Sequence, residues 1–243
     1  MPTVTELLDA YAVGDRTAPA VRMNFVASAD GAVTLDGRSG ALGGDTDRTL
    51  MGVLRALSDV VLVGAGTIRS EGYGGMRVDD ELAAWRVRHG MPPQPRLAIV
   101  TGSADLDPAL GVFADAVTTP IVVTSAHAPL ERRHALDAVA DVLVCGERGV
   151  DLALMRSSLA ERGLPGILCE GGPGLFGALV AVGLVDELCL TLSPTLAGGD
   201  AGRILRGAPA ASRPLRLLHA IADDDGFVFL RYAAATSSAS RIV

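Results

Sequence analysis

The sequence contains no lysine, because all 21 of its basic residues are arginine. A lysine Schiff base and a lysine-dependent phosphate loop are therefore both excluded. Arginine suits rigid, bidentate contacts to phosphates and carboxylates. Codon usage in a GC-rich genome also enriches arginine, so its abundance alone does not indicate a ligand.

Cysteine is scarce, and the histidines are scattered. Cys145, Cys169 and Cys189 are odd in number and form no CxxC pair, so we expect three buried thiols in a reducing compartment. The histidines do not stand at metal-ligand spacing from Cys or Glu, so we predict no metal site and four surface histidines: His89, His127, His134 and His219.

Aromatic residues make up only 4% of the chain and the net charge is −7, which argues against a nucleic-acid partner. No apolar run approaches the about 18 residues of a membrane span. The first residues lack the basic and apolar regions of a signal peptide. We therefore expect a cytoplasmic protein without a membrane partner.

Hydrophobic residues, 49% of the chain, occur in short runs between turn residues, with strand and helix patterns alternating. The runs predict strands at 21–27, 59–63, 97–101, 121–124, 142–145, 166–170 and 187–192. Helices are expected from Asp45 or Thr46, at 82–89 (exposed), 131–138 and 152–161, and from the end of the turn 171–174 through Val182, while 64–71 is expected to form a turn and the start of a helix. A hairpin joins 215–221 to 227–232 across Asp223-Asp224-Asp225-Gly226.

These patterns predict an α/β domain at 21–233, preceded by an N-terminal arm at 1–20 and followed by a flexible tail at 234–243. Alternating strands and helices favour a mostly parallel sheet with helices on both faces, closed by the antiparallel hairpin. In such sheets ligands bind beyond the carboxyl ends of the strands.

Two glycine-rich turns follow buried strands at that edge. Residues 167–176 (ILCEGGPGLF) run from a strand through Gly171 and Gly172 into a helix, and residues 63–69 (VGAGTIR) follow another strand. Glycines let backbone approach a phosphate, and a helix start offers unpaired N–H groups. Together the turns predict an extended anion cradle, and we expect Gly171→Val to block it.

Polar residues cluster near these turns: Asp30, Asp45, Arg48, Arg55, Thr67, Glu71, Arg77, Thr101 and Glu170. Glu170 stands directly at a strand's carboxyl end, where it could bind a substrate amide or amine. For Arg55, a ligand contact and a solvated helix terminus both remain open. No G-x-S-x-G elbow or hydrolase triad is present.

Five segments in order resemble one family: 24–31 (NFVASADG), 54–59 (LRALSD), 63–71 (VGAGTIRSE), 97–101 (LAIVT) and 169–173 (CEGGP). The chain resembles, over residues 21–233, the reductase half of the bifunctional riboflavin-biosynthesis deaminase–reductase and its stand-alone pyrimidine reductase relatives. The resemblance implies a dihydrofolate-reductase-like three-layer fold, a homodimer and NADPH. The implied reaction is hydride transfer to the open-chain sugar imine of a 5-amino-6-(5-phosphoribosylamino)uracil-type substrate.

The resemblance also implies site residues. Cofactor contacts would be Ala27, Gly64, Gly66, Thr67, Glu71, Thr101, Gly171, Gly172, Pro173, Gly174, Leu175 and Phe176. Substrate contacts would be Asp45, Arg55, Arg77 and Glu170, with Arg55 and Arg77 on the sugar phosphate. Removing Arg55 is then expected to raise KM mainly for a phosphorylated substrate. Glu71 and Glu170 are the catalytic candidates, with the proton coming from either of them or from water.

The chain departs from the family in three places. Asn24 replaces a usual lysine, the Ser-x-Trp near Gly40–Asp45 is missing, and no deaminase zinc signature is present. The chain can therefore catalyse at most the reductive step. Two alternatives stay open: reduction of another heterocycle such as dihydrofolate, and NADPH binding without turnover.

Overall fold

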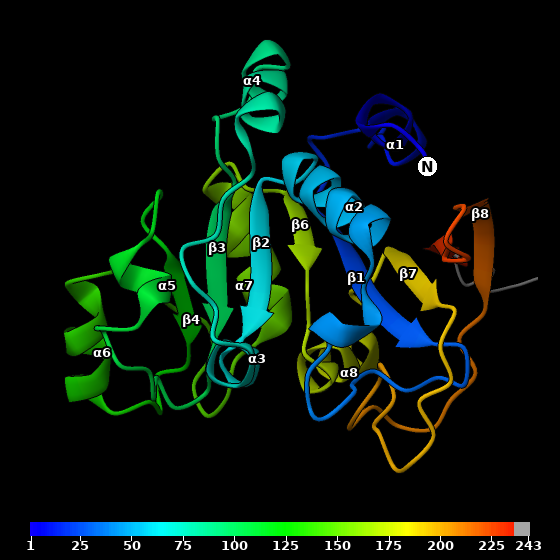
Figure 1. Cartoon of the computed structure of the whole chain (residues 1–243). Helices are drawn as coiled ribbons and strands as arrows, with labels where there is room; N and C mark the ends of the chain where they lie inside the picture. The colour runs from blue at the N-terminus through cyan, green and yellow to red at the C-terminus, as the bar shows by residue number, and fades with distance from the viewer. Residues whose placement is uncertain (236–243) are drawn as a thin grey trace, which may run out of the picture.

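Within residues 1–235, which the computed structural model describes, the strands form one nine-stranded sheet in the order β5-β4-β3-β2-β6-β1-β7-β9-β8 (Figure 1). The strands are β1 Ala20–Ser28, β2 Val60–Gly64, β3 Arg96–Val100, β4 Ile121–Thr124, β5 Asp141–Val144, β6 Gly166–Cys169, β7 Glu187–Ser193, β8 Leu215–Ala222 and β9 Val228–Ala234. Pairing from β5 through β7 is parallel, and β9 pairs antiparallel with both β7 and β8. The predicted mostly parallel sheet with a closing hairpin is confirmed.

Helices cover both faces of the sheet, as predicted. They are α1 Val4–Ala10, α2 Asp45–Ala56, α3 Ala65–Glu71, α4 Asp80–Arg88, α5 Gly111–Ala114, α6 Leu130–Asp137, α7 Leu152–Glu161 and α8 Pro173–Ala181, with a 3-10 turn η1 at Gly40–Leu42. One buried cluster joins residues of α1 to α6 to one face, and the other joins α7 and α8 to the opposite face. In Figure 1, α2 lies in front of the strands and α7 behind them.

Successive residues of the central strands alternate between these two clusters. On β2, Val61 and Val63 pack into the first cluster, whereas Val60 and Leu62 pack into the second. Period-two alternation between two buried faces produces the continuous apolar runs seen in the sequence. The three cysteines are all buried, as predicted.

Some local predictions were wrong. The helix expected to be exposed, α4, buries Arg86, whose guanidinium donates to the carbonyls of Ala56, Ser58 and Pro92. His219 is half-buried against the edge of the Tyr11 ring rather than lying on the surface. The short α5 and η1 were missed, since neither has a side-chain cap among the described residues and each is too brief for periodicity.

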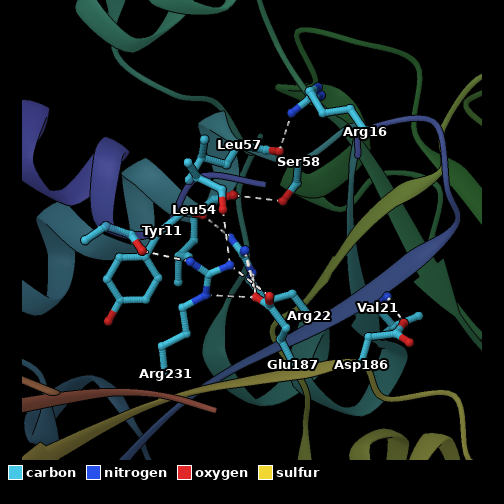
Figure 2. Close-up of polar contacts among 12 residues, drawn as sticks. Tyr11, Arg16, Val21, Arg22, Leu54, Leu57, Ser58, Asp186, Glu187 and Arg231 are labelled. Carbon is cyan, nitrogen blue, oxygen red and sulfur yellow. Dashed lines mark hydrogen bonds and ion pairs between the residues drawn. The ribbon is translucent and has the colours of Figure 1, made fainter. Parts of the chain in front are cut away.

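The first helix packs into the main core, with Leu7 and Tyr11 fully buried. Figure 2 shows the polar contacts that hold it there. Arg22 donates to the carbonyl of Tyr11 at 3.0 Å, and Arg231 donates to that of Ala10 at 2.7 Å. Both arginines also pair with Glu187. The predicted tail lies mostly outside the described residues.

No helix among the described residues has the length and apolarity needed to cross a membrane.

Candidate active site

The two glycine-rich turns predicted from the sequence lie against each other at the carboxyl edge of the sheet. The amide of Gly64, at the end of β2, donates to the carbonyl of Gly171, after β6, at 2.8 Å. A Cβ atom on Gly64 would stand 3.7 Å from the same carbonyl oxygen. The Gly171–Gly172 peptide bond is cis. The turns therefore form one continuous surface.

A pocket of about 550 Å³ opens beside these turns, and we call it the glycine pocket. It is lined by eight of the predicted cofactor residues: Gly64, Gly66, Thr67, Thr101, Gly172, Pro173, Gly174 and Leu175. Helices α3 and α8 both begin here, and no described side chain caps either start. Their first backbone N–H groups can therefore bind an anionic ligand.

Two arginines that the sequence analysis missed also line the glycine pocket. Arg69 comes from α3, and Arg206 comes from the long connection between β7 and β8. The backbone amide of Arg206 donates to the carbonyl of Pro173 at 3.1 Å, which ties this connection to the start of α8. Arg206 belongs to no motif, so only the tertiary structure brings it to the pocket.

A second pocket, of about 460 Å³, lies between β1, α2 and α3, and we call it the β1–α2 pocket. The predicted residues Arg55, Glu71 and Glu170 line it. The two pockets share four lining residues: Thr67, Ser70, Gly172 and Pro173. Ligands in the two pockets would therefore meet at the glycine turn.

Glu170 is the acceptor of a compact polar cluster in the β1–α2 pocket. Nε and Nη2 of Arg55 donate to its two carboxylate oxygens at 2.6 and 2.7 Å, and the Tyr73 hydroxyl also donates to it. The Glu170 side chain is 8% exposed and that of Arg55 is 15% exposed. Such a bidentate pair is strong in a partly desolvated site.

The electrostatics of this cluster keep its donors protonated. Burial alone would lower the pKa of Arg55, but the Glu170 carboxylate and Tyr73 raise it above its ordinary value. Burial and the same carboxylate raise the pKa of the Tyr73 hydroxyl well above its ordinary value. The sequence analysis missed Tyr73 because it stands among glycines in a loop without a recognisable pattern.

Glu71 is the last residue of α3, and its carboxylate lies at the β1–α2 pocket beside the shared residues Thr67 and Ser70. It accepts hydrogen bonds at 3.3 Å from both the amide and the hydroxyl of Ser39. Gly72 then takes a left-handed conformation, with φ of +66°, that ends the helix and leads the chain away.

Asp47 is an acidic pocket residue that the sequence analysis overlooked. With Met51 and Arg55 it forms a stripe of α2 at i, i+4 and i+8 that lines the β1–α2 pocket. Burial raises the pKa of the Asp47 carboxyl above its ordinary value of 3.8, and the nearby Thr191 and Arg48 offset part of this effect. The helical spacing from Arg55 was the signal that could have identified it.

Five predicted site residues line neither pocket. Asp45 is exposed and pairs with Arg48, Arg77 is exposed, and Ala27 is buried. Phe176 is buried and stacks on Phe25 with ring centroids 5.2 Å apart. The fifth, Gly171, is buried, and its carbonyl accepts the hydrogen bond from Gly64. Ligand contacts by these five residues stay predictions.

The structure gives a different physical reason for the expected effect of Gly171→Val. Gly171 has a φ of +91°, and a Cβ atom there would lie 2.7 Å from the ring of Phe25. A side chain at this position would therefore strain the turn and displace Phe25 rather than fill the glycine pocket. By contrast, a Cβ atom on Gly66 would meet open space.

Comparison with known proteins identifies the family. The sequence model of the RibD C-terminal domain matches residues 19–229. The 2,5-diamino-6-ribosylamino-4(3H)-pyrimidinone 5′-phosphate reductase of Archaeoglobus fulgidus is 30% identical over 182 residues, which covers 74% of this chain and 83% of that protein. The reductase of the same name from Methanothermobacter thermautotrophicus is 30% identical over 187 residues, covering 77% and 83%.

Among solved structures, a pyrimidine reductase-like protein from Corynebacterium diphtheriae has the same fold, with a TM-score of 0.84 and 26% identity. The match covers 97% of this chain and 100% of that one. The resemblance seen in the five sequence segments is thus confirmed. The chain belongs to the RibD C-terminal domain family, a family of oxidoreductases.

Proposed function

We propose that this protein is an NADPH-dependent reductase of a phosphoribosylaminopyrimidine, of the 5-amino-6-(5-phosphoribosylamino)uracil type, in riboflavin biosynthesis. The observation that carries the proposal is the junction of the two pockets at Thr67, Ser70, Gly172 and Pro173. A cofactor in the glycine pocket and a substrate in the β1–α2 pocket would touch there, as direct hydride transfer requires. The names of the archaeal relatives support this reaction class.

The glycine pocket fits a phosphate-rich dinucleotide. Gly66 leaves its pocket side open, and the first turns of α3 and α8 supply N–H donors. Arg69 and Arg206 supply cations that match a diphosphate and the additional phosphate of NADPH. When bound, NADPH supplies the hydride.

The chain's own residues would orient the substrate and move a proton. In the reduction, the C1′=N bond of the open-chain sugar gains a hydride on carbon and a proton on nitrogen. Glu71 is the carboxyl group beside the residues shared by both pockets, so we assign it the proton transfer. Glu170 already accepts from Arg55 and Tyr73, and we assign it the orientation of the substrate.

Arg55 keeps a role toward the sugar phosphate in this proposal. Its Nε and Nη2 are bound to Glu170, and Nη1 has no hydrogen-bond partner among residues 1–235. One N–H edge therefore remains for a phosphate oxygen. The homodimer, the cytoplasmic location and the phosphate contact by Arg77 remain predictions.

The decisive experiment compares NADPH oxidation with the phosphoribosylaminopyrimidine and with dihydrofolate. We expect the pyrimidine to have the higher kcat/KM. In the same assay Gly66→Asp, which places a carboxylate at the glycine pocket, should weaken NADPH binding at least about tenfold. Gly66→Ala, which adds only a methyl group, should bind nearly as the parent does. NADPH binding without oxidation of either substrate, or equal affinities of the two variants, would refute the proposal.

A further inference from the structure

Tyr73 stands on the segment between α3 and α4, and packing fixes the position of its ring. The ring packs against the buried cluster that joins helices α1 to α6 to the sheet. Two residues further on, a Cβ atom on Gly75 would stand 1.9 Å from the carbonyl oxygen of Asp115, so this segment lies directly against the chain that follows α5. The Tyr73 hydroxyl is thereby held at the Arg55–Glu170 cluster in the β1–α2 pocket.

The Tyr73 hydroxyl closes a ring of three groups with Arg55 and Glu170. It accepts a hydrogen bond from Nη2 of Arg55 at 2.9 Å and donates one to Oε2 of Glu170. Nη2 also donates to Oε2 at 2.7 Å, so this one nitrogen serves two acceptors. Burial and the Glu170 carboxylate raise the pKa of the Tyr73 hydroxyl well above its ordinary value, so the hydroxyl keeps its proton at neutral pH.

These contacts decide which part of the Arg55 guanidinium remains for a ligand. A guanidinium binds a phosphate most strongly through two parallel N–H groups on two of its nitrogens. Nε and Nη2 together face Glu170, and the remaining edge of the guanidinium would need Nη1 and Nη2. Because Tyr73 also engages Nη2, Nη1 is the guanidinium nitrogen that has no hydrogen-bond partner among residues 1–235.

The other charges of the pocket do not replace this contact. Arg48 is the second basic side chain that lines the β1–α2 pocket, and it is 61% exposed. A cation so exposed to solvent contributes little binding energy. Three carboxylates line the same pocket: Asp47, Glu71 and Glu170. A phosphate bound here therefore depends mainly on what Arg55 can offer.

We propose that Tyr73 is a positioning residue that acts through Arg55: it holds Nη2, limits Arg55 to a single-nitrogen contact with a ligand phosphate, and so reduces the affinity that this phosphate provides. The inference rests on the proposed function and deepens it, because it concerns the phosphate of the same substrate. Tyr73→Phe keeps the ring packing and releases Nη2 for a second contact. If the hydroxyl instead oriented Arg55 toward the phosphate, the same change would weaken phosphate binding.

The first arm of the test measures kcat/KM with NADPH for the phosphoribosylaminopyrimidine and for the same compound without its phosphate. We expect the ratio of the two values to rise at least about fivefold in Tyr73→Phe, because a hydrogen bond to a charged group is gained. The second arm requires no reduction and measures the Kd of ribitol 5-phosphate and of ribitol by NMR titration. The ratio of these constants should change in the same direction.

Tyr232→Phe is the matched control, because Tyr232 lies on β9, packs into the cluster on the opposite face of the sheet and lines neither pocket. It should keep the wild-type ratios. A second control repeats Tyr73→Phe in a protein that carries Arg55→Met and Glu170→Gln. There the ratios should not change, since the nitrogen that Tyr73 holds is absent.

A ratio that falls or stays equal in folded Tyr73→Phe would overturn the inference and leave the reductase proposal intact. An equally large rise in the protein that lacks Arg55 would overturn it as well. If neither pyrimidine is reduced, the reductase proposal fails, and the NMR arm alone decides whether Tyr73 limits the phosphate contact.

Discussion

At the scale of single residues, three charged side chains of α2 line the β1–α2 pocket: Asp47, Arg48 and Arg55. Arg55 is neutralised by Glu170 in a bidentate pair. Asp47 has no bidentate arginine partner of this kind, and burial raises the pKa of its carboxyl, an effect that Thr191 and Arg48 partly offset. A partly desolvated carboxylate of this kind costs stability when it is ionised.

The raised pKa of Asp47 makes a prediction about stability. Because the folded state holds this proton more tightly than the unfolded chain, stability falls as pH rises from about the ordinary value of 3.8 through the folded pKa. Asp47→Asn removes that loss. We therefore expect the variant to have a higher Tm than the wild type near neutral pH, with the difference vanishing toward pH 3.8. A Tm difference that is independent of pH would contradict this account.

For the Arg55–Glu170 pair we predict the opposite effect, a loss of stability when one charge is removed. Arg55→Met leaves the Glu170 carboxylate buried without its cation, and we expect a loss of about 3 kcal/mol in the free energy of unfolding. Adding Glu170→Gln should recover most of the loss, because the orphaned charge is then removed. Urea denaturation measures both effects, with exposed Arg88→Met as the control. A double variant no more stable than the single one would argue against this cause.

At the scale of elements, the glycine pocket depends on how helix α8 meets the connection between β7 and β8. A Cβ atom on Gly177 would lie 1.9 Å from the carbonyl oxygen of Arg206, so the helix and this connection are in direct backbone contact. The amide of Arg206 binds the carbonyl of Pro173 in the first turn of the same helix. Helix α8 therefore positions the arginine as well as offering its own N–H groups.

Gly177→Ala tests this contact. The added methyl group must displace the Arg206 segment, which should cost about 1–3 kcal/mol of stability and weaken NADPH binding several-fold. Gly52→Ala is the control, because its Cβ atom would meet only the side chain of Leu82, at 3.3 Å. Fluorescence titration and thermal unfolding give the two readouts. Undiminished NADPH affinity in Gly177→Ala would show that Arg206 is not held by this contact.

At the scale of the whole molecule, one charge network joins the first helix to both parallel and antiparallel parts of the sheet (Figure 2). Glu187 on β7 binds Arg22 of β1 and Arg231 of β9, and the same arginines donate to carbonyls at the end of α1. Residues 4–11 are therefore packed as part of the core rather than standing apart from it.

Glu187→Gln should loosen this network. Burial alone would raise the pKa of Glu187, but Arg231 and Arg22 hold it below its ordinary value of 4.5. The carboxylate thus contributes stability above pH 4.5 that is lost as pH falls through its folded pKa. We expect the variant to lose about 2 kcal/mol near neutral pH, with the loss shrinking in acid. Denaturant melts of both proteins across that pH range would show whether the difference narrows.

Local sequence patterns predicted most of the sheet and, at the candidate site, the two glycine turns. Short apolar runs ending in glycine located β2 and β6 to within a residue or two, and both glycine turns line the predicted pocket. Arg206, Tyr73 and Asp47 were missed, because loop connections and one helical stripe bring them to the site. The resemblance named Asp45, whose ligand contact stays a prediction, whereas the fold shows that Asp47 lines the β1–α2 pocket.

By itself, the sequence determined the α/β class, the parallel order of strand and helix, the family and the glycine turns, because each depends on contacts or spacing within a short stretch of chain. The tertiary structure decided that Arg55 is paired with Glu170, that Arg206 reaches the glycine pocket, and that Asp47 lines the β1–α2 pocket. Those properties depend on which segments, distant in sequence, become neighbours in the fold, and on how burial changes the energy of a charged side chain. No local pattern encodes either of these.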